Sequence, residues 1–417
     1  MTRPARYVRT PLAAAVLASV LAVTACGLMG GDARTATPAA SGDGVLRLGL
    51  LLDATGGSQY LSDSERAGVV LAVQQANAAG GFAGKPVELL PPESGADTGA
   101  AAQRLAKAGA DAVIGPTDSG HAPAAIDALR SAKVPLISPA NTAAGLSTYR
   151  SDGYYFRTAA PEGAEGAALV ELARQSGAKT VAILHQAGDH GKAEADGASA
   201  AAKAAGLTEK GSSEFTGHDA GAGAAAAKDA DAVIVVAQSE GQAILAAVSQ
   251  AGVPGNKLLV SGDLLGRYGS ALANGALRGA RATVPGVFPS PDFQAALTEH
   301  APGLTDLTFA PEAYDAAALA ILAAGAAKDD GGPSIAAKLT AVSGGALPGN
   351  PSEAREKCTG LPDCLARQAR GASIDYDGTS GPIAFDSHGD VTTARFMVFT
   401  FGADNLPARD AEVTVAR

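Results

Sequence analysis

Short apolar runs alternate with longer stretches of helical periodicity from Val45 onward. Runs such as LRLGLLLD, ADAVIGP and VPLISPA have little polar alternation, which is typical of parallel strands buried on both faces. The stretches between them have the length and pattern of crossover helices. The pattern therefore predicts an α/β fold built on parallel sheets.

The apolar run ADAVI occurs twice, beginning at Ala110 and at Ala230, and a small polar loop follows each copy. The pattern around the first copy predicts strands over 46–53, 85–91, 110–116 and 134–140, with helices over 98–108 and 121–133. The pattern around the second predicts strands over 179–185, 230–237 and 256–263, with helices over 191–205 and 240–251. The repeat thus marks equivalent strands of two similar α/β units.

The first long helix carries start and stop signals. In SDSE, Ser62 is predicted to cap the helix and Glu65 to reach back as its capping-box partner. Gly80 and Gly81 are predicted to end it.

The N-terminal residues resemble a targeting signal. Arg3, Arg6 and Arg9 precede an apolar stretch too short to span a bilayer, and VTAC follows, ending at Cys26. We interpret residues 1–25 as a lipoprotein signal peptide, Cys26 as the lipidated residue and residues 26–44 as a flexible tether. The alternative is an ordinary secretory signal with a chance cysteine, and both imply export.

Cys358 and Cys364 form a C-x5-C pair that predicts a short-loop disulfide in an exported protein. A metal site is the alternative, but no histidine stands near at ligand spacing. We expect no metal and no cofactor.

Composition narrows the class of protein. At 417 residues, two domains are expected. The net charge of −10 and the absence of Trp disfavour binding to nucleic acid and to anionic lipid surfaces.

Open α/β sheets bind ligands at the carboxyl ends of their strands. The polar residues that follow the predicted strands are small and include a single carboxylate, which favours hydrogen bonding to a small ligand over catalysis: Ser119, Asn141, Thr142, His190, Gln238 and Asp263. Some of these hydroxyls could instead be helix caps.

An enzyme alternative rests on Ser239. It lies between a strand and a helix in an A-x-S-x-G context, which weakly resembles the nucleophile elbow of α/β hydrolases. Asp263 and either His300 or His388 follow in the required order, but no oxyanion segment precedes them. We therefore expect a protein that is not an enzyme.

In order and spacing, several segments resemble the type I periplasmic binding proteins, in particular the leucine/isoleucine/valine-binding and amide-binding members of ABC importers. They include RLGLLLDATGG, ADAVIGPTDSGHAPAA, VPLISPANTAAGLS, YYFRTAA and IDYDGTSGPIAFDSHGD. The resemblance implies two Rossmann-like, doubly wound lobes joined by three hinge crossings. Lobe I would comprise residues 45–157 and 286–390, and lobe II residues 158–285 and 391–417.

The same resemblance implies roles for the polar residues. Ser119, Asn141 and Thr142, with nearby backbone N–H groups, would hold the α-carboxylate of an amino acid, and Asp263 would hold its α-ammonium. Where members of the family commonly present tyrosines, this chain has Leu61 beside Tyr60, and also His190 and Gln238. These departures favour a more polar ligand than a branched aliphatic amino acid.

The function that the resemblance implies is ligand capture outside the cell membrane, with delivery to an ABC permease. We expect a monomer held to the outer face of a bacterial membrane by lipid alone, binding an amino acid or amide-like solute. A ligand sensor of the same fold, read by a signalling partner, is the alternative.

Overall fold

The computed structural model describes residue 1 and residues 36–53, 59–346 and 354–416. Cys26 and the predicted signal peptide beyond its first residue lie outside this part of the chain. Within it, no helix has both the length and the apolar character needed to cross a bilayer.

The smaller of the two main sheets is parallel and has the strand order β2-β1-β3-β4-β5. Its strands are β1 (Arg47–Leu50), β2 (Glu88–Leu89), β3 (Ala112–Ile114), β4 (Leu136–Ser138) and β5 (Tyr155–Arg157). The helices that accompany it are α1 (Gln59–Ala78), α2 (Thr98–Lys107), α3 (Ala122–Ala132), α8 (Pro291–His300), α9 (Ala310–Ala327), α10 (Gly332–Val342) and α11 (Leu361–Ala369).

The larger sheet repeats this arrangement and extends it at one edge, giving the order β15-β14-β10-β9-β8-β6-β7. Its strands are β6 (Thr180–Gln186), β7 (Thr208–Phe215), β8 (Ala232–Val236), β9 (Leu258–Val260), β10 (Arg281–Pro285), β14 (Thr393–Phe401) and β15 (Pro407–Ala416). Its helices are α4 (Gly163–Gln175), α5 (Asp189–Ala204), α6 (Gly221–Ala227) and α7 (Gly241–Gln250). Strands β14 and β15 are antiparallel to their neighbours.

The two copies of ADAVI form β3 and β8, which lie at the same position in the two sheets. Strand β3 lies between β1 and β4, and β8 lies between β6 and β9. The prediction of two equivalent units is confirmed. The reason is physical: a central parallel strand is buried on both faces, so the same apolar run is required in each half.

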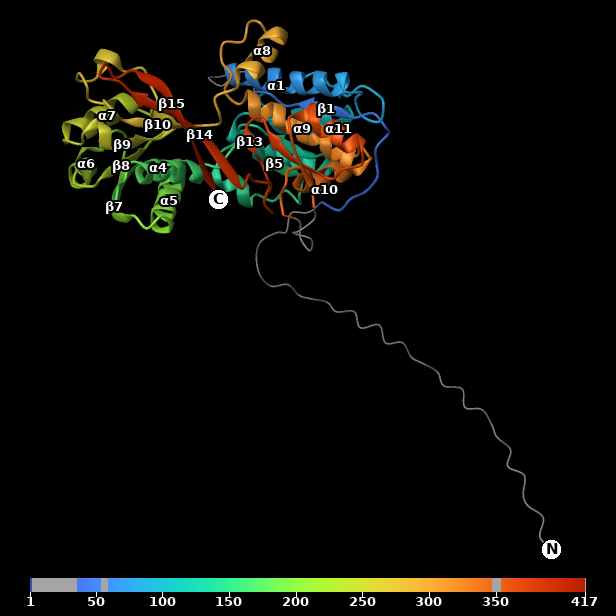
Figure 1. Ribbon diagram of the computed structural model, residues 1–417, viewed down its shortest axis with the longest axis horizontal. Helices are drawn as coiled ribbons and strands as arrows, with labels where there is room; N and C mark the ends of the chain where they lie inside the picture. The colour runs from blue at the N-terminus through green and yellow to red at the C-terminus, as the bar shows by residue number, and fades with distance from the viewer. Residues whose placement is uncertain (2–35, 54–58, 347–353, 417) are drawn as a thin grey trace. The chain divides into compact units, whose positions relative to one another are not determined.

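Helices cover both faces of each sheet, because alternate strand residues point to opposite sides. In β3, Val113 packs in a cluster with Leu105 of α2 and Ile126 of α3, whereas Ile114 belongs to the cluster that contains α1 and α9. In β8, Val235 packs in a cluster with Ile244 of α7, and Ile234 belongs to the cluster that contains residues of α5. Figure 1 shows α7 and α5 on either side of this sheet. The fold is therefore the expected pair of doubly wound units.

Within the described residues, the chain passes three times between the two main sheets. It leaves the smaller sheet after β5, returns after β10 and crosses again into β14. Pairing of β14 with β10 joins the C-terminal strands to the larger sheet, so both units contain segments that are distant in sequence.

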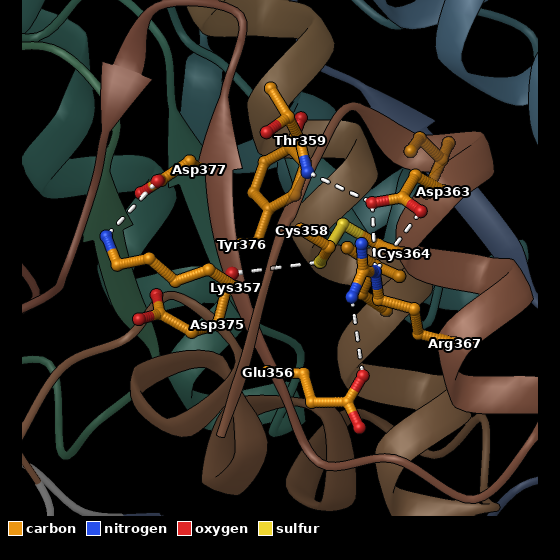
Figure 2. Close-up of a disulfide and its surroundings, with 12 residues drawn as sticks. Glu356, Lys357, Cys358, Thr359, Asp363, Cys364, Arg367, Asp375, Tyr376 and Asp377 are labelled. Atoms are coloured by element: carbon orange, nitrogen blue, oxygen red, sulfur yellow. Dashed lines mark hydrogen bonds and ion pairs between the residues drawn. A yellow bond between two sulfur atoms is a disulfide. The ribbon is translucent and has the colours of Figure 1, made fainter. Parts of the chain in front are cut away.

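A small third sheet, β11-β12-β13, carries the disulfide. Its strands are β11 (Glu356–Thr359), β12 (Ile374–Gly378) and β13 (Gly381–Pro382). Figure 2 shows Cys358 of β11 bonded to Cys364 of α11, the pairing that the spacing predicts. Arg367 of α11 pairs with Asp363 at 3.0 Å and with Glu356 of β11 at 3.4 Å. The disulfide and the ion pair between Arg367 and Glu356 tie one strand to one helix.

The predicted cap at the start of the first helix is wrong. Helix α1 begins at Gln59, before Ser62, so Ser62 lies inside the helix and caps nothing. Its hydroxyl donates to the carbonyl of Asp53 at 3.1 Å. Glu65 is buried and accepts a hydrogen bond from Thr117 at 3.0 Å. Both side chains face the interior, where Ser62 bonds to Asp53 after β1 and Glu65 bonds to Thr117 after β3.

The segment just before β1 is bound to the folded unit. Backbone N–H groups of Gly42 and Gly44 donate to the carboxylates of Asp329 and Asp330, at 3.0 and 3.1 Å. This docking corrects the prediction that residues 26–44 form a flexible tether throughout, because residues 41–44 are held by specific hydrogen bonds.

Candidate functional site

A cavity of about 300 Å³ lies where loops at the carboxyl ends of strands from both main sheets meet. One wall belongs to the smaller sheet and its helices: Leu61, Thr117, Ala140, Thr142, Thr308 and Phe309. The facing wall belongs to the larger sheet and its helices: Glu162, Glu165, His190, Glu194, Gly262 and Asp263. This is where ligands bind in open α/β sheets, and the volume suits a small metabolite.

Buried polar side chains behind the cavity wall fix the loop that carries Thr142. Asn141 is completely buried, and its amide donates to the carbonyls of Pro116 and Thr117 at 2.9 and 3.0 Å. Arg157, also buried, donates to the carbonyl of Asn141 and forms an ion pair with Asp390 at 2.7 Å. These contacts hold Thr142 at the cavity wall.

The backbone N–H groups of this loop are already bonded within the protein. Ser119 Oγ accepts from the N–H groups of Thr142 and Ala143 at 3.1 and 3.3 Å. Ser138 Oγ accepts from Ala140 and Asn141 at 3.3 and 3.0 Å. These N–H groups are therefore satisfied without a ligand carboxylate.

On the facing wall, His190 is surrounded by carboxylates. Its Nδ1 lies 3.1 Å from Glu162, and its Nε2 lies 3.2 Å from Glu194 and 3.3 Å from Asp263. Burial alone would lower the pKa of His190, but the contacts with Asp263, Glu162 and Glu194 raise it to about 11. His190 is therefore an imidazolium at neutral pH.

The carboxylates around His190 differ in their surroundings. Burial raises the pKa of Glu165 to about 7, although Thr283 and the N–H of Gly262 donate to it, both at 2.8 Å. Burial and the nearby Glu165 raise the pKa of Glu194 well above its ordinary value. Burial also opposes ionisation of Glu162, but hydrogen bonding to His190 outweighs it and lowers the pKa of Glu162.

The structure brings three of the predicted residues together at the cavity: Thr142, His190 and Asp263. Ser119 and Asn141 lie behind the wall and support the loop. Gln238 is exposed and does not line the cavity; its N–H donates to Gln186 at 3.0 Å. Tyr60 lies in the first turn of α1, and its side chain falls outside the described residues.

Sequence reasoning missed Glu162, Glu165 and Glu194, which are three of the four carboxyl side chains that line the cavity. A signal was available in the spacing. Glu194 follows His190 by four residues on a helix, and Glu165 follows Glu162 by three, so each pair shares a helical face. Their burial was not visible, because both helices are rich in small residues without a clear apolar stripe.

Ser239 has no hydrogen bond to a histidine among the described residues. Its hydroxyl lies 3.3 to 3.4 Å from the side-chain amide of Gln186, so its hydrogen-bond partner is an amide rather than a histidine. His300 lies on α8, beside another cavity. The elbow-like sequence forms the turn between β8 and α7.

That other cavity, of about 320 Å³, is formed by α1 and the end of α8 with the loop that follows it. Of its charged side chains, Asp63, Arg66 and His300 are exposed and Asp306 is half-buried. The cavity between the sheets is the better candidate because it concentrates buried polar groups from several elements. Among the described residues, no group of His, Cys, Asp or Glu could hold a metal ion.

Two doubly wound units with a polar cavity at their strand ends define a protein that binds a small ligand between two lobes. Residues 45–399 match the family model described as periplasmic binding protein, and the chain belongs to that family. Membership implies a substrate-binding role and a location outside the cytoplasm.

Similar proteins differ in their roles and ligands. A chemotactic signal transduction system substrate-binding protein, BasB of Halobacterium salinarum, is 28% identical over 347 residues, or 77% of this chain and 78% of that protein. The branched-chain amino acid transporter substrate-binding protein LivJ of Streptococcus pneumoniae, solved with isoleucine, is 22% identical with a TM-score of 0.57, covering 89% of this chain and 100% of that one. A solute-binding protein of an ABC transporter from Rhodopseudomonas palustris, solved with p-hydroxybenzoic acid, is 18% identical with a TM-score of 0.61, covering 89% and 97%.

Proposed function

We propose that this chain is the lipid-anchored, substrate-binding component of an ABC importer, and that it captures a small polar solute of the amino acid or amide type. The observation that carries the proposal is the cavity lined by strand-end loops of both sheets, in a chain of the periplasmic binding protein family. Lipid anchoring rests on the VTAC sequence that ends at Cys26.

The mechanism is a shift of population between open and closed arrangements of the lobes. A ligand that contacts Thr142 on one wall and Asp263 on the other gains both sets of interactions only when the lobes close. The three crossings of the chain between the sheets are the natural hinges. Because Asp263 is half exposed, its carboxylate is available to a ligand amine.

The test is thermal unfolding of the full-length protein, purified in detergent, against single amino acids, amides, urea, polyamines and aromatic acids. A ligand at about 100 times its Kd adds about 2.7 kcal/mol to the unfolding free energy, which raises the Tm of a chain of this length by about 3 °C. We expect such a rise with members of one chemical class. No rise with any compound in the panel would contradict the proposal.

A second candidate function is that of a receptor-like sensor whose ligand-bound form is recognised by a signalling partner. The similarity to a chemotactic substrate-binding protein favours it. Deletion of the gene distinguishes the two functions. Loss of uptake of the radiolabelled ligand supports import, whereas normal uptake with loss of a response to the ligand supports sensing.

A further inference from the structure

We propose that the ligand carries a net positive charge and that Glu194 and Asp263 bind its cationic nitrogen. A diamine or a basic amino acid fits this description. The inference rests on the proposed binding function and narrows its ligand class.

The charge of the cavity wall is the first argument. Four carboxyl side chains, Glu162, Glu165, Glu194 and Asp263, line the cavity, and His190 is the one cationic side chain among the lining residues that the structure describes. Nδ1 of His190 is hydrogen-bonded to Glu162, and Nε2 lies 3.2 Å from Glu194 and 3.3 Å from Asp263 without a hydrogen bond among the described residues. The wall therefore has more acidic groups than its own cation can pair.

Glu194 is the second argument. Its side chain is fully buried and lines the cavity, and one oxygen, Oε1, lies near His190. Among the residues that the structure describes, the other oxygen, Oε2, has neither a hydrogen bond nor an ion pair. A buried carboxyl group without a donor is costly, so this oxygen is poised to accept an N–H group that the protein does not supply.

The opposite wall offers little to an anion, which is the third argument. No Lys or Arg is found among the described residues that line the cavity. The N–H groups of residues 140–143 are bonded to Ser119 and Ser138, and the hydroxyl of Thr117 donates to Glu65. An aromatic acid without an amine would place another negative charge beside these carboxyl groups. No Lys or Arg of the described cavity lining could pair with that charge.

The experiment compares ligands that share a shape and differ in charge. Calorimetric titration of the full-length protein uses L-lysine, L-ornithine and putrescine against L-norleucine, which has the chain of lysine without its terminal amine, and against benzoate. We expect at least one cationic compound to bind 30-fold or more tightly than norleucine, and benzoate not to bind. Norleucine or benzoate binding as tightly as every cationic compound would overturn this inference while leaving the proposed function intact. Failure of all ligands in this set and in the wider panel would defeat the proposed function itself.

Variants locate the effect. Glu194→Gln should weaken the cationic ligand by at least 10-fold while leaving the weak affinity for norleucine within about 2-fold. Asp263→Asn, at a half-exposed position that should not disturb folding, should act in the same direction. The matched control is Glu240→Gln, whose carboxylate pairs with His218 outside the cavity lining. Equal affinity of the cationic ligand for wild type and both cavity variants would overturn the assignment.

Discussion

Glu65 shows how the interior sets the charge of one side chain. It is almost completely buried behind Thr117, and Oε1 has no hydrogen-bond partner among the described residues. Burial raises the pKa of Glu65 to about 8, and the hydrogen bond from Thr117 opposes this only in part. At neutral pH the folded protein therefore favours the protonated acid at this position.

This shift predicts a pH dependence of stability. A carboxyl group with a raised pKa in the folded state stabilises that state below its unfolded pKa, and the benefit is lost as the pH rises toward 8. Glu65→Gln should remove this loss, so its unfolding free energy should exceed that of wild type increasingly between pH 5 and 8, by on the order of 3 kcal/mol. Urea denaturation across this range measures the difference.

The control for that experiment is Glu299→Gln, on the exposed end of α8. It measures the effect of replacing an exposed glutamate by glutamine, against which the curve for Glu65→Gln is compared. Parallel curves for Glu65→Gln and wild type between pH 5 and 8 would show that Glu65 is ionised in the folded protein throughout.

The sequence predicted part of the site at this scale and missed the rest for a physical reason. Thr142, His190 and Asp263 follow apolar runs, so a strand-end argument places them at the cavity. Glu194 lies inside a helix, and only the packing of α4 against α5 buries it. A helical sequence alone does not show which face packs on a neighbour when alanine and glycine occupy most positions.

At the scale of elements, the apolar strands were predictable, whereas the two polar strands at the edges of the larger sheet were not. Strands β3 and β8 are apolar throughout, whereas β7, with the sequence TEKGSSEF, is mostly exposed at the edge of its sheet. Strand β15, PARDAEVTVA, lies at the opposite edge with a similarly polar outer face. An edge strand keeps one side in water, so no apolar run marks it.

The disulfide between β11 and α11 yields a prediction for these two elements. Replacing Cys358 and Cys364 with Ser should lower the unfolding free energy by about 2 kcal/mol, because a short closed loop no longer restricts the unfolded chain. Urea denaturation with and without reductant provides the measurement. Reductant should lower the unfolding free energy of wild type by the same amount and leave that of the double variant unchanged. An equal response of both proteins would contradict the prediction.

At the scale of the whole molecule, one buried apolar cluster joins the two units. It contains Ile114 of the smaller sheet and Ile234 of the larger sheet, together with residues of α9 and β14. Because α9 and β14 come after β10 in the chain, neither unit is complete without the C-terminal third. The contacts that complete each unit thus form only when most of the chain is present.

We therefore expect the protein to unfold as one cooperative system. Differential scanning calorimetry of the full-length protein should give a single transition whose calorimetric and van't Hoff enthalpies agree. The replacement of Cys358 and Cys364 with Ser, which affects only the small third sheet and α11, provides the comparison. If two transitions are resolved and this variant shifts only one of them, the units unfold separately.

The docking of residues 41–44 onto Asp329 and Asp330 has a consequence for how the protein searches for its partner. If Cys26 carries the proposed lipid, the chain between the membrane and the docked segment spans about 15 residues, whose contour cannot exceed roughly 50 Å. The folded unit then explores a thin layer over the membrane instead of the surrounding volume. Encounters with a membrane-embedded partner then depend on lateral diffusion. The greatest distance of the folded unit from the bilayer is limited by the point at which Asp329 and Asp330 hold the chain.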